Sequence, residues 1–294
     1  MSEAEDSLFR TDAEYEQDGD EKFLLAEAAL SRTRFELHEW CGALFDARRY
    51  LDEARESYKA GSILLFQDKK DRIEIFSQRI QRVHEECLTR IERGNKFRDT
   101  LKSEGSIDEY IDSLEVGWLL RQEVYGKSSD QVQDHVEELI RSLNAAGAHL
   151  TSNLSLSPPI DPAERAARRR QTAAAHNLLQ RAELLCSSGS DAVADRIRRR
   201  RLRAVTLNGL GCLHTAAGQL PLALARLDEA LRIELSLDRP ERPAATHLNL
   251  CAVLSRLGNH RRALDHAECA VTLLRAAVRT APPQHTQARR RGAS

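Results

Sequence analysis

The sequence of 294 residues is poor in the residues that build sheets, membrane spans and cysteine-rich frameworks. Aromatic residues make up only 5%, there are 8 prolines, and no run of about 18 apolar residues occurs. The 6 cysteines are scattered with no Cys-x-x-Cys pair, so we interpret them as reduced, small, buried residues of a cytoplasmic protein. These absences argue against a sheet protein, a membrane span and a cysteine-based metal framework.

The abundant residues favour helices, and the charged ones are unevenly distributed. Charged residues make up 30% and apolar residues 41%, a mixture that can bury a core between amphipathic helices. Residues 1–150 contain 21 Lys and Arg against 33 Asp and Glu, whereas residues 151–294 contain 23 against 12. The acidic first half and the basic second half are therefore expected to attract each other or to face different partners.

Helical periodicity predicts ten helices joined by short polar turns. Their expected ranges are 21–46, 51–66, 70–103, 106–124, 129–152, 162–187, 190–217, 220–236, 242–256 and 260–279. Alternating helices and turns indicate an all-α fold of stacked antiparallel hairpins, in one domain over residues 21–280. The acidic residues 1–20 have no apolar stretch, so we expect a disordered tail and no secretory signal there. A second, basic disordered tail is expected over residues 281–294.

An internal repeat is clearest towards the end of the chain. When Gly218 is aligned with Gly258, the two copies have small side chains, large apolar side chains and alanines at matching positions. The matched pairs are Leu210 with Leu250, Gly211 with Cys251, Ala223 with Ala263, and Ala230 with Ala270. A small residue lets the second helix of a hairpin pack closely, and a glycine provides a left-handed cap at the end of the first helix. Alanines seven residues apart place two small side chains on one face of the second helix.

These spacings resemble the tetratricopeptide repeat, in which Leu-Gly, a turn glycine and two alanines recur along a helical hairpin. Residues 41–61 resemble it too, through Gly42, Phe45, Leu51, Ala54, Tyr58 and Gly61, as do residues 97–117 more weakly. Arg121-x-x-x-Tyr125-Gly126 resembles the kinesin-light-chain type of this repeat. The resemblance implies a right-handed α-solenoid of about five hairpins. It also implies a non-catalytic scaffold whose concave groove binds a peptide or helix of another protein. The alternative that it implies is an adaptor in a microtubule-motor or ciliary or flagellar assembly.

The stretch Gly209-Leu210-Gly211 has two interpretations, a phosphate-binding loop and a close approach of two helices. A phosphate loop needs a preceding strand and glycines with free backbone N–H groups. Here the glycines lie within a helical pattern, no strand is expected before them, and no Gly-Lys-Ser/Thr follows. Helix packing is therefore the favoured interpretation.

The resemblance also implies which residues line the groove. In this family an asparagine at the sixth repeat position bonds the backbone of an extended peptide. Asn249 holds that position, and Asn208 stands one place earlier in the preceding repeat. We take Asn208, Asn249, Ser255 and Arg256 as candidate peptide-binding residues, with a merely solvated helix surface as the alternative.

Two His–Cys pairs could share a helix face as metal ligands, His247 with Cys251 and His266 with Cys269. Because His247 and Cys251 occupy repeat positions that normally pack, buried or half-buried helix residues are the favoured interpretation. We expect no metal and no cofactor. An enzyme would need convergent titratable groups, and the sequence singles out no such set.

Arginines crowd two of the expected helices. The candidates for contact with an acidic partner are Arg168, Arg169, Arg170, Arg198, Arg199, Arg200 and Arg201. Such a partner could be an acidic protein segment or a cytoskeletal protein. Residues 165–203 contain no Phe, Tyr or Trp for base stacking, so nucleic acid is the weaker alternative. A further alternative is that these arginines only neutralise the acidic half of the chain.

Overall fold

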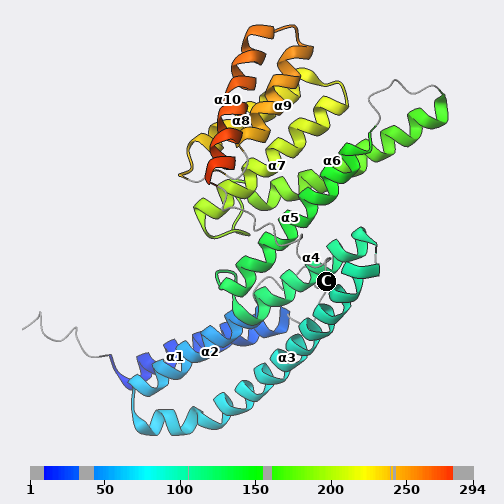
Figure 1. Ribbon diagram of the computed structural model, residues 1–294. Coiled ribbons are helices and arrows are strands. Elements are labelled where there is room, and N and C mark those ends of the chain that lie inside the picture. Colours follow the sequence, from blue (N-terminus) through cyan, green and yellow to red (C-terminus); the bar gives the residue numbers. More distant parts are fainter. Residues whose placement is uncertain are drawn as a thin grey trace, which may run out of the picture. The chain divides into compact units, whose positions relative to one another are not determined.

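The computed structural model describes residues 10–32, 43–104, 106–154, 161–238, 240 and 243–280. These residues form helices and turns with no strand, so the expected all-α fold is confirmed (Figure 1). Contacts divide the chain into two compact units, Met1–Ser142 with Asp191–Ala194, and Leu143–Ser190 with Asp195–Ser294. The tail expected over residues 281–294 lies outside the described residues.

The first unit contains α1 (Asp12–Arg32), α2 (Ala43–Ala60), α3 (Ile63–Glu104), α4 (Ile107–Tyr125) and the beginning of α5 (Asp130–Ser152). Consecutive helices from α1 to α4 pack on each other, as in an α-solenoid, and α3 is a long curved helix (Figure 1). Their shared core includes Phe23 of α1, Leu51 and Tyr58 of α2, and Phe76 of α3.

Helix α1 begins at Asp12, within the range expected to be a disordered tail. Thr11 and Glu14 cap it, because the Thr11 backbone N–H donates to Glu14 Oε2 at 2.6 Å. Farther along, Gly19 lies so close to the Tyr58 ring that an added Cβ would be 2.4 Å from a ring carbon. The expectation of disorder is therefore wrong for residues 12–20, because the cap and the tertiary contact outweigh the acidic composition.

Helix α2 is continuous where the repeat copy at residues 41–61 predicts a turn. Ala47, Leu51, Ala54 and Tyr58 are all buried along one face of the same helix. The next turn comes at Gly61 and Ser62, where α3 then begins. This copy is therefore not a helical hairpin, and its Gly42 lies outside the described residues.

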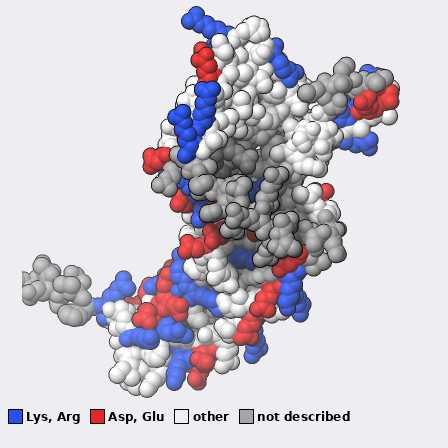
Figure 2. Space-filling view, viewed as in Figure 1, with Lys and Arg blue, Asp and Glu red and all other residues white. Residues whose placement is uncertain are grey.

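The surface of the first unit mixes both signs of charge. Figure 2 shows Lys and Arg interspersed with Asp and Glu over the region of α1 to α3. Lys69 pairs with Glu16 at 2.6 Å, and Arg72 pairs with Asp20 at 3.1 Å. Some of the acidic side chains of this unit are therefore paired with its own basic residues.

The second unit contains the end of α5, followed by α6 (Pro162–Cys186), α7 (Arg196–Ala216), α8 (Leu220–Leu235), α9 (Pro243–Arg256) and α10 (His260–Thr280). Consecutive helices from α6 to α10 pack on each other. Asp161 caps α6 by accepting from the Glu164 N–H at 2.7 Å, with Pro162 in the first turn. Asp195 caps α7 by accepting from the N–H groups of Ile197 and Arg198.

The turns of the α7–α8 and α9–α10 hairpins are built alike. Gly218 and Gly258 have φ angles of 76° and 77°, the left-handed conformation that the repeat predicts. The next N–H in each copy, Gln219 or Asn259, bonds the carbonyl five residues earlier, at 2.8 and 2.9 Å. The paired alanines of the second helices, Ala223, Ala230, Ala263 and Ala270, are all buried. The internal repeat is therefore present in the backbone as well as in the sequence.

Within the described residues, no helix has both the length and the apolarity needed to cross a membrane.

Candidate functional site

The two candidate asparagines lie on neighbouring first helices of the repeat and contact each other. Asn249 Nδ2 of α9 donates to Asn208 Oδ1 of α7 at 3.0 Å, and both side chains are partly buried. Two helical turns farther along α9, Arg256 Nη1 donates to the backbone oxygen of Thr215 of α7 at 2.8 Å. We call this surface the ladder face, comprising Asn208, Cys212 and Thr215 of α7 with Asn249 and Arg256 of α9.

The ladder face holds three of the four predicted groove residues in one arrangement. Asn208, Asn249 and Arg256 each take part in a cross-helix hydrogen bond. Ser255 is exposed beside Arg256, and no hydrogen bond joins its side chain to the described residues. The role of these residues in binding a peptide stays a prediction, and the hydrogen bond between the asparagines was not predicted from the sequence.

Three of the arginines of α7 bind other residues of the second unit. Arg199 Nη1 donates to the Ser190 carbonyl at 3.1 Å, and Arg200 donates to the Ser236 hydroxyl. Arg203 pairs with Glu229 at 2.6 Å. These contacts hold the α7 arginine run to its own unit, which weakens the case for Arg199 and Arg200 as partner contacts.

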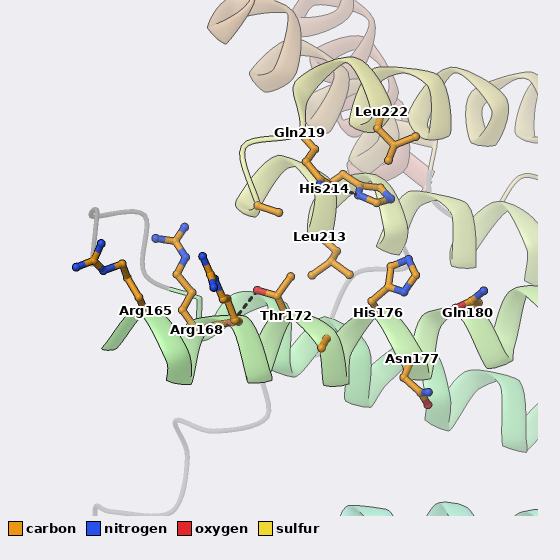
Figure 3. Close-up of a pocket in the computed structure, with 13 residues that line it drawn as sticks. Arg165, Arg168, Thr172, His176, Asn177, Gln180, Leu213, His214, Gln219 and Leu222 are labelled. Atoms are coloured by element: carbon orange, nitrogen blue, oxygen red, sulfur yellow. Dashed lines mark hydrogen bonds between the residues drawn. The ribbon is translucent and has the colours of Figure 1, made fainter. Parts of the chain in front are cut away.

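The arginines of α6 have a different environment, because three of them line a cavity. The cavity has a volume of about 1080 Å³ and lies between α6, the end of α7 and the start of α8. Its polar lining comprises Arg165, Arg168, Arg169, Thr172, His176, Asn177, Gln180, His214 and Gln219 (Figure 3). Arg170 is exposed on α6 and does not line it. The sequence pointed to Arg168 and Arg169 but missed the histidines and amides, which the fold brings beside them.

Gly209 and Gly211 lie inside α7, no strand precedes them in the part of the chain that the structure describes, and both approach leucines. A Cβ at Gly211 would lie 2.5 Å from Leu227 Cγ of α8, and one at Gly209 would lie 3.0 Å from Leu179 Cδ2 of α6. The glycines therefore permit close helix packing, as the sequence predicts.

The histidines that the sequence considered as zinc ligands pair across helices. His247 Nδ1 of α9 lies 2.9 Å from His266 Nδ1 of α10, with ring centroids 5.1 Å apart. A bond between two such nitrogens requires one protonated and one unprotonated ring nitrogen. Among the described residues, no three His, Cys, Asp or Glu side chains gather in a way that could hold a metal ion. The His–Cys pairs along each helix therefore do not extend to a metal centre there.

We expect the His247–His266 pair to make stability sensitive to pH. Burial, and secondarily the charge of His266, lowers the pKa of His247 below its usual 6.5. The unfolded chain therefore binds more protons than the folded one just below pH 6.5, and stability falls on acidification. Loss of the shared hydrogen bond is expected to cost about 1 kcal/mol. Urea unfolding at about pH 7.5 and 5.0 measures this.

His266→Gln is the informative variant, since it removes one member of the pair. The acid-induced loss of unfolding free energy should become smaller than in the wild type. His260→Gln is the matched control, because His260 is exposed at the start of the same helix. An identical pH dependence in both variants would contradict the assignment.

The cysteines differ in exposure, which corrects the expectation that all are buried. Cys87 and Cys186 are buried, Cys212 and Cys251 are partly exposed, and Cys269 is exposed on α10. Burial raises the pKa of the Cys87 and Cys186 thiols to about 11, so both stay protonated at neutral pH. A protonated, buried thiol is neither a nucleophile nor a metal ligand.

Comparisons with known proteins add little to these observations. No protein-family model matches the chain, and no curated protein matches it. A similar solved structure is the crystal structure of BtubC (BKLC) from P. vanneervenii, which is 16% identical. The alignment covers 97% of this chain and 96% of that one, with a TM-score of 0.38. At that TM-score the likeness carries no argument about function, which must come from the helical-repeat architecture and the surfaces described above.

Proposed function

We propose that the protein is a non-catalytic helical-repeat scaffold whose ladder face binds an extended peptide of another protein. The observation that carries the proposal is the Asn249–Asn208 hydrogen bond between the first helices of successive repeats. Side chains tied in this way are already ordered, so binding costs them little further conformational entropy.

The asparagine pair leaves groups that suit a peptide backbone. An asparagine side chain has one carbonyl acceptor and two N–H donors, and the pair uses one of each. The Asn249 oxygen and the Asn208 amino group remain available, with no further partner among the described residues. Every residue of an extended peptide, proline apart, offers one N–H and one C=O. One residue of such a peptide can therefore satisfy both groups.

Arg256 supports the same surface from its other end. Its guanidinium is exposed, and one nitrogen is held by the Thr215 carbonyl at 2.8 Å. An arginine has five N–H donors, so donors remain after that bond. The ladder face thus offers backbone-directed amides beside a cation, and peptides with an acidic residue near that end are favoured.

The test is selection of peptides from a displayed random library on the wild-type protein, followed by measurement of their affinities. Asn208→Ala/Asn249→Ala should weaken the selected peptides by roughly tenfold, since each lost hydrogen bond is worth about 0.5–1.5 kcal/mol. Asn153→Ala is the matched control, because Asn153 is an exposed asparagine after α5 that belongs to neither the ladder face nor the cavity lined by α6. Peptides that bind the double variant and the wild type equally would refute the ladder face as the binding site.

A further inference from the structure

The cavity between α6 and the α7–α8 turn lies on the opposite side of α7 from the ladder face. Leu213 and His214 of α7 contribute to it, together with Ala217, the residue that caps the end of α7. With about 3.6 residues per turn, these positions point away from the α7 residues of the ladder face. The two surfaces share no residue, so the cavity raises a separate question about binding.

The lining of the cavity is basic, and the described residues that form it include no acidic side chain. Three arginines and two histidines contribute to it, with no Asp or Glu among the lining residues. Arg169 is exposed and forms no hydrogen bond or ion pair with the described part of the chain, and Arg165 bonds only the Asp161 carbonyl of its own helix. A cleft lined by one sign of charge concentrates ions of the opposite sign.

Neighbouring groups hold parts of this lining in place. Arg168 Nη2 donates to the Ala216 carbonyl near the end of α7 at 3.0 Å, which ties α6 to that helix. His214 Nδ1 lies 2.8 Å from Gln219 Oε1, and its ring packs edge-on against the His176 ring, with centroids 6.1 Å apart. Figure 3 shows Arg165 and Arg168 at one end of α6, and His176 and Gln180 towards the other. The cavity therefore has an arginine-rich end and an end that bears amides and imidazoles.

One histidine of the amide-bearing end has a lowered pKa. Burial lowers the pKa of His214, an effect that the Gln219 hydrogen bond partly opposes and the His176 charge reinforces. A neutral His214 leaves the arginines as the fixed positive charges of the cavity at physiological pH.

The size of the cavity and its lining indicate which kind of anionic ligand fits it. The span from Arg165 to Gln180 along α6 is about 22 Å at 1.5 Å per residue. An extended chain of roughly seven residues has this length. Leu213, Leu222 and Ala173 give apolar contact beside the amides, whereas the described lining contains no Phe, Tyr or Trp to stack on a base. These features suit an extended peptide better than a single phosphate or a nucleic acid.

We propose that this cavity is a second binding site, which takes an extended acidic segment of a partner protein with its Asp or Glu side chains at the end formed by Arg165, Arg168 and Arg169. The site is separate from the ladder face, so either assignment can fail while the other stands.

The test uses a fluorescein-labelled peptide of about seven residues with four glutamates, and a matched peptide with four glutamines. Fluorescence anisotropy should show binding of the glutamate peptide only, and its affinity should fall as salt is added. Arg165→Ala/Arg169→Ala should weaken binding about tenfold, because two charge-assisted contacts are lost. Arg170→Ala is the matched control, since Arg170 is adjacent and exposed but does not line the cavity, and its affinity should stay near the wild-type value.

Several results would overturn the proposal. One is no binding of the glutamate peptide at peptide concentrations up to about 1 mM. Another is equal weakening by Arg170→Ala and by the double variant, which would indicate only a diffuse charge effect. Displacement of the peptide by inorganic phosphate or by a short single-stranded RNA at a lower concentration than the unlabelled peptide would assign the cavity to those ligands instead. Asn208→Ala/Asn249→Ala should leave this binding unchanged, and circular dichroism of each variant checks that the helices remain.

Discussion

Replacing Leu179 with alanine is expected to lower the free energy of unfolding of the second unit by about 2–5 kcal/mol. The Leu179 side chain is fully buried and packs against two glycines on different helices. A Cβ at Gly147 of α5 would lie 2.7 Å from Leu179 Cγ, and one at Gly209 of α7 would lie 3.0 Å from its Cδ2. The helix backbones that surround this leucine cannot move in to fill its place, so truncation leaves a cavity.

Leu184→Ala is the matched control, because Leu184 lies on the same helix α6 and is 64% exposed. The same substitution there should change stability by less than about 1 kcal/mol. Urea or guanidinium unfolding followed by circular dichroism measures both variants. Similar losses at the two positions would show that Leu179 is not held between α5 and α7.

The later part of the fold could be predicted because its signals are local. Capping residues and turn glycines, such as Asp161, Gly218 and Gly258, lie at the helix ends and act within a few residues. The periodicity between them is regular, and the predicted and observed bounds of α4, α5, α6, α8, α9 and α10 agree within one residue. Sequence reasoning works well where each helix carries its own start and stop.

The first part of the fold was predicted less well, for two physical reasons. Charge composition suggested disorder at residues 12–20, but Gly19 and Tyr58 make a contact between helices that composition does not show. The capping box Thr11–Glu14 was a local signal that could have been used. The turn predicted inside α2 rested on the spacing of the repeat. Residues 43–60 contain no Gly or Pro that would end a helix there.

The start of α7 was predicted too early for a similar reason. Residues 191–194 precede the Asp195 cap and belong to the first unit. The Ala194 N–H donates to Gln133 Oε1 of α5 at 2.8 Å, and Val193 is fully buried. Contacts with residues about sixty positions earlier in the chain decide this conformation, and local periodicity cannot reveal them.

The candidate sites, too, were predictable where the signal is local and not where it depends on tertiary packing. Asn208 and Asn249 could be placed on one surface because the repeat fixes their register, but their mutual hydrogen bond depends on side-chain conformations. The cavity needed the packing of α6 on the α7–α8 turn, so His176 and His214 could not be assigned to it from the sequence. The sequence shows the dense run of arginines. It does not show that some of them, such as Arg199 and Arg200, are hydrogen-bonded within the second unit.

Gly211→Ala is expected to destabilise the α7–α8 hairpin by about 1–3 kcal/mol, even though alanine favours a helix by about 1 kcal/mol over glycine. The added Cβ would lie 2.5 Å from Leu227 Cγ and 2.6 Å from its Cδ2. Leu227 is fully buried, so its branch point cannot move aside unless the two helices separate. Repulsion from overpacking therefore exceeds the gain in helix propensity.

Gly94→Ala is the matched control for the sign of the effect. Gly94 lies within α3, and a Cβ added there meets no atom within 4 Å. Only the helix-propensity term applies, and a gain of about 0.5–1 kcal/mol is expected. Denaturant unfolding followed by circular dichroism, to which helices of both units contribute, gives the change in unfolding free energy of both variants under the same conditions.

Opposite signs at Gly211 and Gly94 would show that the Gly-Leu-Gly stretch serves helix packing. Had these glycines been present to bring backbone N–H groups to a phosphate, Gly211→Ala would leave the hairpin as stable as before, or more so, and would reduce ligand binding instead. Stabilisation by both substitutions would therefore contradict the close approach of α7 and α8 at Gly211, on which the internal repeat and the placement of the ladder face both depend.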